Sequence, residues 1–163
     1  LFNSIVEAGK EFSLRHFGTY AMESMRVEKS YRMWGADLTR EYSILEAGLN
    51  RFVSLAKDDF VGKEALLLQK ETGVPQEFVT IEIEVNDADA LGSEPIFKNG
   101  EMVGRATSGC YGHSVKKSLA LAYVKSGNGD IGTELEIEIL GERCLGRVIN
   151  ESPCDPKNLK LKA

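Results

Sequence analysis

The sequence predicts an α+β fold, with a partly helical region over residues 1–75 followed by a small antiparallel β-barrel over residues 76–163. Hydrophobic residues make up 42% of the chain and charged residues 28%, which is typical of a soluble globular protein. The spacing of the hydrophobic residues changes from helical to alternating at Pro75. Beyond that point, Asn99-Gly100 separates two short apolar segments, which indicates a β-hairpin.

Two helices are expected at the start of the chain. Apolar residues recur at helical spacing over residues 1–17, and Gly18 ends that segment. The same spacing over residues 20–33 predicts a second helix, which Gly35 breaks. Each glycine therefore marks the expected end of its helix.

The rest of the first region is expected to contain a turn and a third helix. Residues 44–55 mix the two hydrophobic periods, so we expect a short turn that leads into a strand. Residues 60–71 are spaced as a helix. Asp58 or Asp59 is a suitable N-cap for this helix, and Gly73 suits the position that follows it.

The second region alternates as strands do. Apolar residues occupy every second position over residues 79–85 and 134–140, with mostly threonine or glutamate between them, which predicts strands with one wet face. Residues 118–125 and 143–149 are further expected strands. Because about five or six short strands joined by tight turns follow one another, the sequence predicts an antiparallel barrel.

Charge and hydropathy exclude several kinds of partner. The net charge is −5, and the two regions carry −1 and −4, so neither has the basic excess that nucleic-acid binding requires. No apolar segment approaches the roughly 20 residues of a membrane span. The glycines of residues 104–112 have no helical pattern after them, so we expect a barrel turn there and no phosphate-binding loop. Nucleic acid and membranes are therefore not expected partners.

The three cysteines, Cys110, Cys144 and Cys154, are widely spaced and odd in number. No Cys-x-x-Cys pair is present, and only His16 and His113 could help to complete a zinc site. We therefore expect free thiols in a reducing compartment and no bound metal.

Two acids are candidates for ligand binding. Glu28 could accept paired N–H groups from a heterocycle, and the aromatic rings of Tyr31 and Trp34 follow it closely. This combination suits a flat, hydrogen-bonding ring such as a pterin. The alternative is a solvated helix acid with ion pairs around it and a tryptophan in the core. Glu46 lies between apolar neighbours, where a buried carboxylate needs partners.

Five separated segments form a recognisable set. They are MRVEKSYRMWGADL at residues 25–38, LEAGL at 45–49, DFVGKEAL at 59–66, TSGC at 107–110 and SVKKSLALAYV at 114–124. In this order they resemble the glycine cleavage T-protein (aminomethyltransferase) superfamily. The first segment is most similar to the tetrahydrofolate-binding region of dimethylglycine and sarcosine dehydrogenases. T-proteins usually have Tyr-Gly where this chain has Trp34-Gly35.

The resemblance implies a fold and an activity. It implies a folate-binding α+β domain over residues 1–75 and a C-terminal Greek-key β-barrel domain over residues 76–163. The implied chemistry is the oxidation of an N-methyl amine at a flavin, followed by capture of its carbon by tetrahydrofolate as 5,10-methylene-tetrahydrofolate. The FAD domain and the family's catalytic aspartate are expected before Leu1. We therefore expect this chain to be part of a longer folate-dependent enzyme, with no catalytic residue of its own and no activity alone.

The resemblance also implies which residues contact folate. Glu28 matches the glutamate that hydrogen-bonds the pterin, and Trp34 matches a position, commonly tyrosine, beside the ring. Glu46 matches a second acid close to the folate. Lys57 falls where T-proteins have an arginine, so the charge is kept and the planar fork is lost. Tyr31 completes the expected folate site.

Two alternatives remain open within this resemblance. One is the aminomethyltransferase of the glycine cleavage system, for which H-protein is the expected partner, and the other is a non-catalytic, folate-binding regulatory module. For a dehydrogenase-like enzyme, the expected ligands are folate and a small methylamine-derived substrate. The expected compartment is the cytoplasm of a bacterium or the mitochondrial matrix of a eukaryote.

Overall fold

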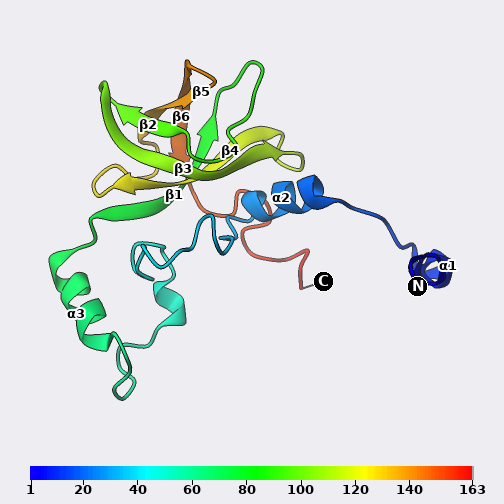
Figure 1. Ribbon diagram of the computed structural model, residues 1–163, viewed down its shortest axis with the longest axis horizontal. Coiled ribbons are helices and arrows are strands. Elements are labelled where there is room, and N and C mark those ends of the chain that lie inside the picture. Colours follow the sequence, from blue (N-terminus) through cyan, green and yellow to red (C-terminus); the bar gives the residue numbers. More distant parts are fainter. Residues whose placement is uncertain (163) are drawn as a thin grey trace.

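The computed structural model describes residues 1–162. Helices occupy the first region and strands the second (Figure 1). The helical elements are α1 (Phe2–Gly9), η1 (Lys10–Phe12), α2 (Thr19–Glu28), η2 (Asn50–Phe52) and α3 (Lys63–Thr72). The strands are β1 (Gln76–Ile83), β2 (Pro95–Lys98), β3 (Glu101–Gly112), β4 (Lys117–Lys125), β5 (Glu134–Ile139) and β6 (Glu142–Ile149).

The strands form a closed barrel in the order β1-β4-β3-β2-β5-β6, and all neighbouring strands are antiparallel. β2, β3 and β4 follow one another as neighbours. β1 pairs with β4, although residues 84–94 separate it from β2 along the chain. This is a Greek-key arrangement. The predicted α+β fold with a C-terminal antiparallel barrel is confirmed.

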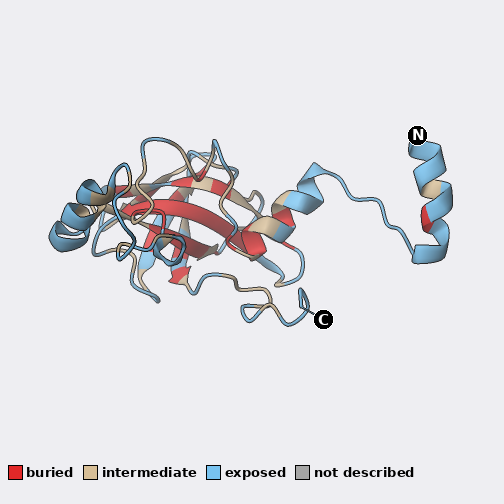
Figure 2. Cartoon of the chain, turned by 90° about the horizontal axis from the view of Figure 1, so that it is seen from below, coloured by how far each residue is buried: buried red, intermediate tan, exposed pale blue. Residues whose placement is uncertain are grey.

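Alternate side chains of the strands form the interior of the barrel, where most buried residues lie (Figure 2). In β1 these are Val79, Ile81 and Ile83, the residues whose alternation predicted the strand. The predicted hairpin between β2 and β3 is also present. Asn99 and Gly100 both have positive φ, 53° and 83°, as a two-residue turn that follows the twist of the strands requires.

The outer face of β1 and β4 is buried as well, because the first region packs against it. Seven consecutive residues of β4 are therefore buried. This second core cluster comprises Phe78 of β1, Leu119, Leu121 and Tyr123 of β4, Val27 of α2, and Ala47. It is the surface on which the first region is built.

The first helix is shorter than predicted. α1 ends at Gly9, and η1 follows it only as far as residue 12. Ser13 then adopts a φ of 55°, and the chain turns so that Leu14 packs on Gly9. A Cβ at Gly9 would lie 2.6 Å from Leu14 Cδ1, so the absence of a side chain there allows this contact.

α2 also ends earlier than predicted. Ser30 has a φ of 52°, and its N–H donates to the Val27 carbonyl at 2.9 Å. The Tyr31 N–H donates to the Arg26 carbonyl at 2.8 Å. Together these bonds form a Schellman motif, which closes the helix before Gly35 is reached.

The segment after α2 differs from the prediction at two points. Residues 44–55 contain turns and η2 but no strand. Gly62, not Asp58 or Asp59, precedes α3, and no side chain caps that helix. Gly73 does follow α3, with a φ of 86°, as predicted.

The glycine-rich residues 104–112 are part of β3 and do not form the predicted turn. Gly104 permits a close approach of β4, since a Cβ there would lie 2.3 Å from the Tyr123 carbonyl oxygen. These glycines therefore serve strand packing.

α1 stands apart from the rest of the molecule (Figures 1 and 2). Its apolar residues Phe2 and Ile5 are exposed, and so are Phe12 and Phe17 after it. None of the helices within residues 1–162 is both long and apolar enough to cross a membrane. The N-terminal segment thus leaves large apolar side chains uncovered in this structure.

Candidate functional site

Glu28, the last residue of α2, is 2% exposed, and its carboxylate points into the turn between β3 and β4. Its Oε1 accepts the Ser114 N–H at 2.5 Å and the Val115 N–H at 3.3 Å. Gly112 permits this approach, since a Cβ there would lie 3.0 Å from Glu28 Cγ. Both side-chain hydrogen bonds of Glu28 within residues 1–162 end on Oε1, so Oε2 is available to another donor. Glu28 is therefore not a solvated helix acid.

The C-terminal end of α2 is capped by a segment that follows β6. The Cys154 N–H donates to the Glu28 carbonyl at 3.1 Å, and the Ser152 hydroxyl donates to the Lys29 carbonyl at 2.7 Å. The Ser152 N–H donates to Ser30 Oγ at 2.8 Å. The first two of these bonds satisfy carbonyls that a helix end leaves without partners. The backbone of Glu28 is thereby fixed as well as its side chain.

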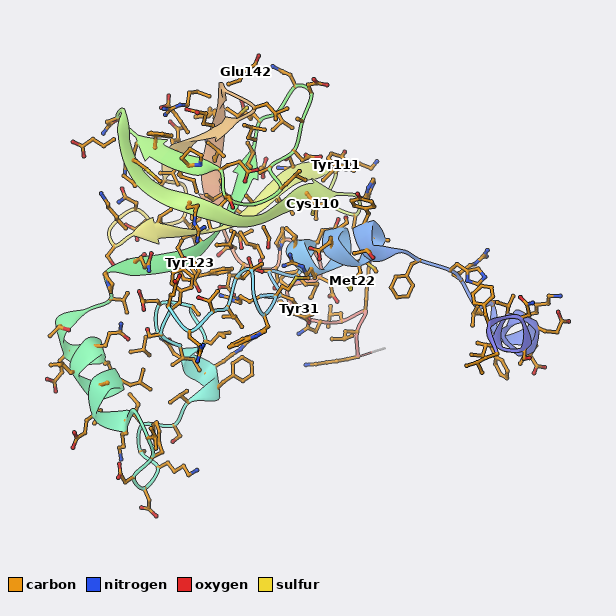
Figure 3. The ribbon with its side chains drawn as sticks, viewed as in Figure 1. Met22, Tyr31, Cys110, Tyr111, Tyr123 and Glu142 are labelled. Carbon is orange, nitrogen blue, oxygen red and sulfur yellow. The ribbon has the colours of Figure 1, made fainter. Side chains whose placement is uncertain are left out.

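Tyr31 and Trp34 lie on the turn after α2 and present their rings at the surface, 47% and 73% exposed. In Figure 3, Tyr31 lies on the side of α2 away from the barrel, whereas Tyr111 lies on the barrel side. Lys29 Nζ is 6.0 Å from the centre of the Tyr31 ring. Trp34 is therefore not a core residue, and both rings are accessible to a ligand.

Asp37, which the sequence analysis did not single out, is fully buried and accepts four side-chain hydrogen bonds. Its Oδ2 accepts Arg26 Nη1 and the Met33 N–H, each at 2.8 Å. Its Oδ1 accepts the hydroxyls of Thr107 and Ser108 on β3, at 2.5 and 2.8 Å. A buried carboxylate is tolerated only with such pairing. Asp37 lies between apolar neighbours in the sequence, which is the signal that could have identified it.

Glu46 is buried in a separate turn that leads towards β1. Its Oε2 accepts the Ser43 N–H at 2.8 Å, and its Oε1 accepts Gln76 Nε2 at 3.1 Å. Its carbonyl accepts the Phe78 N–H at 3.0 Å. Burial acts to raise the pKa of the Glu46 carboxyl, but the hydrogen bonds from Ser43 and Gln76 outweigh it and hold the pKa below its usual value. Glu46 is therefore ionised at neutral pH and holds this turn against β1.

Arg32 connects the end of α2, where Glu28 lies, with the turn that contains Glu46. Its Nη1 donates to the Ser30 carbonyl and its Nε to the Ala47 carbonyl, each at 3.0 Å. Its guanidinium lies over the Phe78 ring, 4.2 Å from the ring centre, and pairs with Glu151. The end of α2 and the Glu46 turn are thus joined through one buried cation.

Lys57 lies apart from these residues, exposed in the loop before α3. Its carbonyl accepts Lys63 Nζ at 2.6 Å. A cleft of about 520 Å³ lies nearby, between the loop over residues 50–56 and the C-terminal end of α3. A second cleft, of about 690 Å³, opens along another side of α3. No residue of α3 is buried, so this helix is loosely seated.

The five residues expected to contact folate therefore fall into three groups. Glu28, Tyr31 and Trp34 surround the end of α2, while Glu46 and Lys57 stand in two other loops. No group of three His, Cys, Asp or Glu within residues 1–162 is arranged to hold a metal ion. The three cysteines are free and partly buried. Burial raises the pKa of the Cys110 thiol to about 11.

Comparison with known proteins identifies the family to which this chain belongs. Residues 1–57 match the family described as "GCVT N-terminal domain", and residues 76–155 match "Glycine cleavage T-protein C-terminal barrel domain". The chain belongs to the glycine cleavage T-protein family. The two matches end and begin on either side of α3. The division into domains at residues 75 and 76 stays a prediction.

Members of this family with named functions are similar over most of the chain. Mitochondrial dimethylglycine dehydrogenase of Homo sapiens is 41% identical over 152 residues, 93% of this chain. An aminomethyltransferase of Geobacillus is 37% identical over 150 residues, 91% of this chain. The chain spans only 18% of the dehydrogenase and 41% of the aminomethyltransferase.

A solved structure of the family has the same fold. The crystal structure of glycine cleavage system aminomethyltransferase T from Bartonella henselae superposes with a TM-score of 0.78 at 25% sequence identity. The match covers 83% of this chain and 38% of that one. The relatives support membership of a family of folate-dependent one-carbon enzymes.

Proposed function

We propose that this chain binds tetrahydrofolate as the C-terminal part of an enzyme like dimethylglycine or sarcosine dehydrogenase. In that role it helps to capture the one-carbon unit of an oxidised N-methyl amine as 5,10-methylene-tetrahydrofolate. The observation that carries the proposal is the buried Glu28 carboxylate, in which Oε1 is bound to the protein and Oε2 is available. FAD is proposed only for a domain outside these residues.

The site fits a pterin in its donor set. A carboxylate oxygen has room for two hydrogen bonds, so Oε2 can receive neighbouring N–H groups of one ring. Because Glu28 lies in a nearly dry position, those bonds are charge-assisted and stronger than they would be in water. The accessible rings of Tyr31 and Trp34, three and six positions after Glu28 in the sequence, are the proposed flat apolar surface for the pterin.

Tetrahydrofolate, when bound, supplies the nucleophilic nitrogen that accepts the one-carbon unit. The residues of this chain hold and orient it, which is how positioning accelerates a transfer between two substrates. Glu28 fixes the ring edge, and Trp34 and Tyr31 shield it from water. Glu46 and Lys57 remain proposed folate contacts, Glu46 as a fixed anion and Lys57 as a mobile cation. No proton transfer is assigned to these residues.

The proposal is tested with Glu28→Gln in the full-length protein. The amide oxygen of glutamine can keep the bonds from Ser114 and Val115, but its NH₂ group then faces the donors of the pterin. We expect affinity for tetrahydrofolate to fall about five- to hundredfold with little change in melting temperature. Isothermal titration and thermal unfolding measure the two quantities. Glu41→Gln, an exposed acid of the same region, is the control and should bind as wild type does.

Two results would reject the proposal: wild-type protein that does not bind tetrahydrofolate, or Glu28→Gln that binds it as well as wild type. The aminomethyltransferase alternative has support in the 37% identical relative. A regulatory role has support in a 33% identical mouse relative, a pyruvate dehydrogenase phosphatase regulatory subunit. Turnover with dimethylglycine or sarcosine, with aminomethyl-loaded H-protein, or with neither, separates the three.

We also propose a compartment from these relatives. The matching human dimethylglycine dehydrogenase is mitochondrial, and the matching Geobacillus aminomethyltransferase comes from a bacterium. The proposed location is the mitochondrial matrix for a eukaryotic source and the cytoplasm for a bacterial one.

A further inference from the structure

A buried carboxylate supports the turn over residues 31–38, in addition to the backbone bonds from Gly35 to Leu38 and from Asp37 and Leu38 to Met33. Asp37 Oδ2 accepts the Met33 N–H at 2.8 Å and Arg26 Nη1 at 2.8 Å. The same Arg26 Nη1 donates to the Tyr31 carbonyl at 3.1 Å. The backbone is therefore fixed at Tyr31 and at Met33, directly before Trp34.

The same carboxylate ties the turn to the barrel. Its Oδ1 accepts the hydroxyls of Thr107 and Ser108, which belong to β3. Ser108 Oγ also accepts Arg26 Nη2 at 2.8 Å, so the arginine, the serine and the carboxylate form a closed ring of bonds. The Tyr123 hydroxyl of β4 donates to the Asp37 carbonyl at 2.9 Å. Both strands are part of the closed barrel, which gives the turn a rigid base.

The rings that this turn carries have no comparable support of their own. Trp34 is largely exposed and Tyr31 about half exposed, so their positions depend on the backbone that carries them. We propose that Asp37 is a positioning residue. By fixing the backbone of the turn, it fixes where Tyr31 and Trp34 lie relative to Glu28 for ligand binding. This inference rests on the proposed function as far as the ligand is concerned.

A carboxylate is needed because every partner of Asp37 can donate. An asparagine retains one acceptor oxygen for Arg26 and Met33, while its NH₂ group would meet the two hydroxyls of β3. Those hydroxyls can rotate and accept, so Asp37→Asn keeps part of the network and loses its charge. Asp37→Ala loses every side-chain bond and leaves Arg26 without its buried partner. The expected order of effects is therefore wild type, then Asp37→Asn, then Asp37→Ala.

The experiment measures tetrahydrofolate affinity in the full-length protein for Asp37→Asn and Asp37→Ala, each with and without Trp34→Ala. We expect Asp37→Asn to weaken binding at least about threefold when Trp34 is present and to have a smaller effect when Trp34 is alanine, because its effect passes through that ring. A residue that served only folding would lower the melting temperature and give additive effects. Ile137→Val, in the barrel core, is the control for lost stability and should leave affinity unchanged.

A second measurement decides the geometry without any ligand. In wild type the Met33 N–H is bonded to a buried carboxylate, and its hydrogen exchange should be slow. Asp37→Asn should accelerate that exchange at least about tenfold, while exchange in β4 stays unchanged. Unchanged exchange at Met33, or strictly additive binding effects, would overturn the inference. If wild type does not bind tetrahydrofolate, the proposed function fails, and the exchange measurement still decides whether Asp37 positions the turn. The exchange measurement on Asp37→Asn also decides the question if Asp37→Ala does not fold.

Discussion

The barrel and the first 75 residues are stabilised in different ways. The barrel encloses its own core, which includes Ile81, Ile96 and Ile137. Within residues 1–75, the buried apolar residues are Val27 and Ala47, and both pack on the outer wall of the barrel. The buried apolar residues of the first region therefore form a core only together with the outer face of the barrel.

What the first region adds is directional bonding. Glu28, Asp37 and Glu46 are all buried, and each accepts hydrogen bonds from backbone or side-chain groups that only one conformation brings together. Apolar packing tolerates small shifts, whereas such bonds weaken steeply when distances or angles change. The first region, which buries few apolar side chains, is thus fixed largely by hydrogen bonds to buried carboxylates.

The comparison is tested most strongly by removing a large apolar side chain from each region. Ile137→Ala, inside the barrel, should lower the free energy of unfolding by about 2–5 kcal/mol, because it leaves a cavity among packed side chains. Phe52→Ala, on the exposed η2, should change it by less than about 0.5 kcal/mol. Urea unfolding measures both. Equal losses would show that residues 1–75 have a core of their own.

The alkylation rate of Cys110 tests whether the first region stays packed against the barrel. Burial raises the pKa of this thiol from its ordinary value of 9.0 to about 11, with the Glu23 carbonyl of α2 lying 3.9 Å from its sulfur. Since only the thiolate reacts, alkylation at pH 8 should be roughly 100-fold slower than in the unfolded chain. Alkylation at the unfolded rate would mean that α2 leaves β3 readily.

The same burial gives a pH dependence of stability. Because the folded-state pKa of Cys110 lies above its unfolded value, its contribution is complete below about pH 9 and is lost as the pH rises through about 11. Burial also raises the pKa of Tyr123, which acts in the same direction. Stability should therefore fall on the alkaline side, which denaturant titrations at pH 8 and pH 11 can measure.

The smallest expected difference comes from one substitution made in both regions. Gly141 and Gly62 have φ values of 85° and 90°, and a Cβ would meet nothing within 4 Å at either position. Alanine should cost about 1 kcal/mol at each, from backbone strain alone. For Gly141→Ala this cost should appear in the unfolding of the barrel. For Gly62→Ala it should appear only as faster amide exchange in α3, and a global loss there would contradict the comparison.

The sequence predicted the barrel well because its signals are local. Alternation at Val79, Ile81 and Ile83 places every second side chain inward, and Asn99-Gly100 defines a turn by its own conformational preferences. The end of α2 was missed because part of its cause lies elsewhere in the chain. The hydroxyl of Ser30, whose φ of 52° ends α2, lies 2.8 Å from Thr80 Oγ1 on β1, a contact that no local pattern signals.

The candidate site divides in the same way. Glu28, Tyr31 and Trp34 could be selected for their chemistry and spacing. All three lie at or just after the end of α2, with the Glu28 carboxylate in the turn between β3 and β4 and Tyr31 on the side of α2 away from the barrel. The partners of Glu28 are 86 and 87 positions away, and those of Asp37 on β3 are 70 and 71 positions away. Such pairing depends on tertiary structure. The folate roles of these residues stay predictions.

The capping of α2 by Ser152 and Cys154 has a consequence for how the chain folds. The bond between Ser152 and Lys29 spans 123 positions, and β1 pairs with β6 as well as with β4. During synthesis, β6 and the capping residues leave the ribosome after α2 and β1, with which they must pair. Until then α2 lacks its cap and β1 one of its neighbours, so apolar surface stays open to association with other chains. Contacts of such high sequence separation make folding slow, and the last strand of the barrel, not the first helix, completes it.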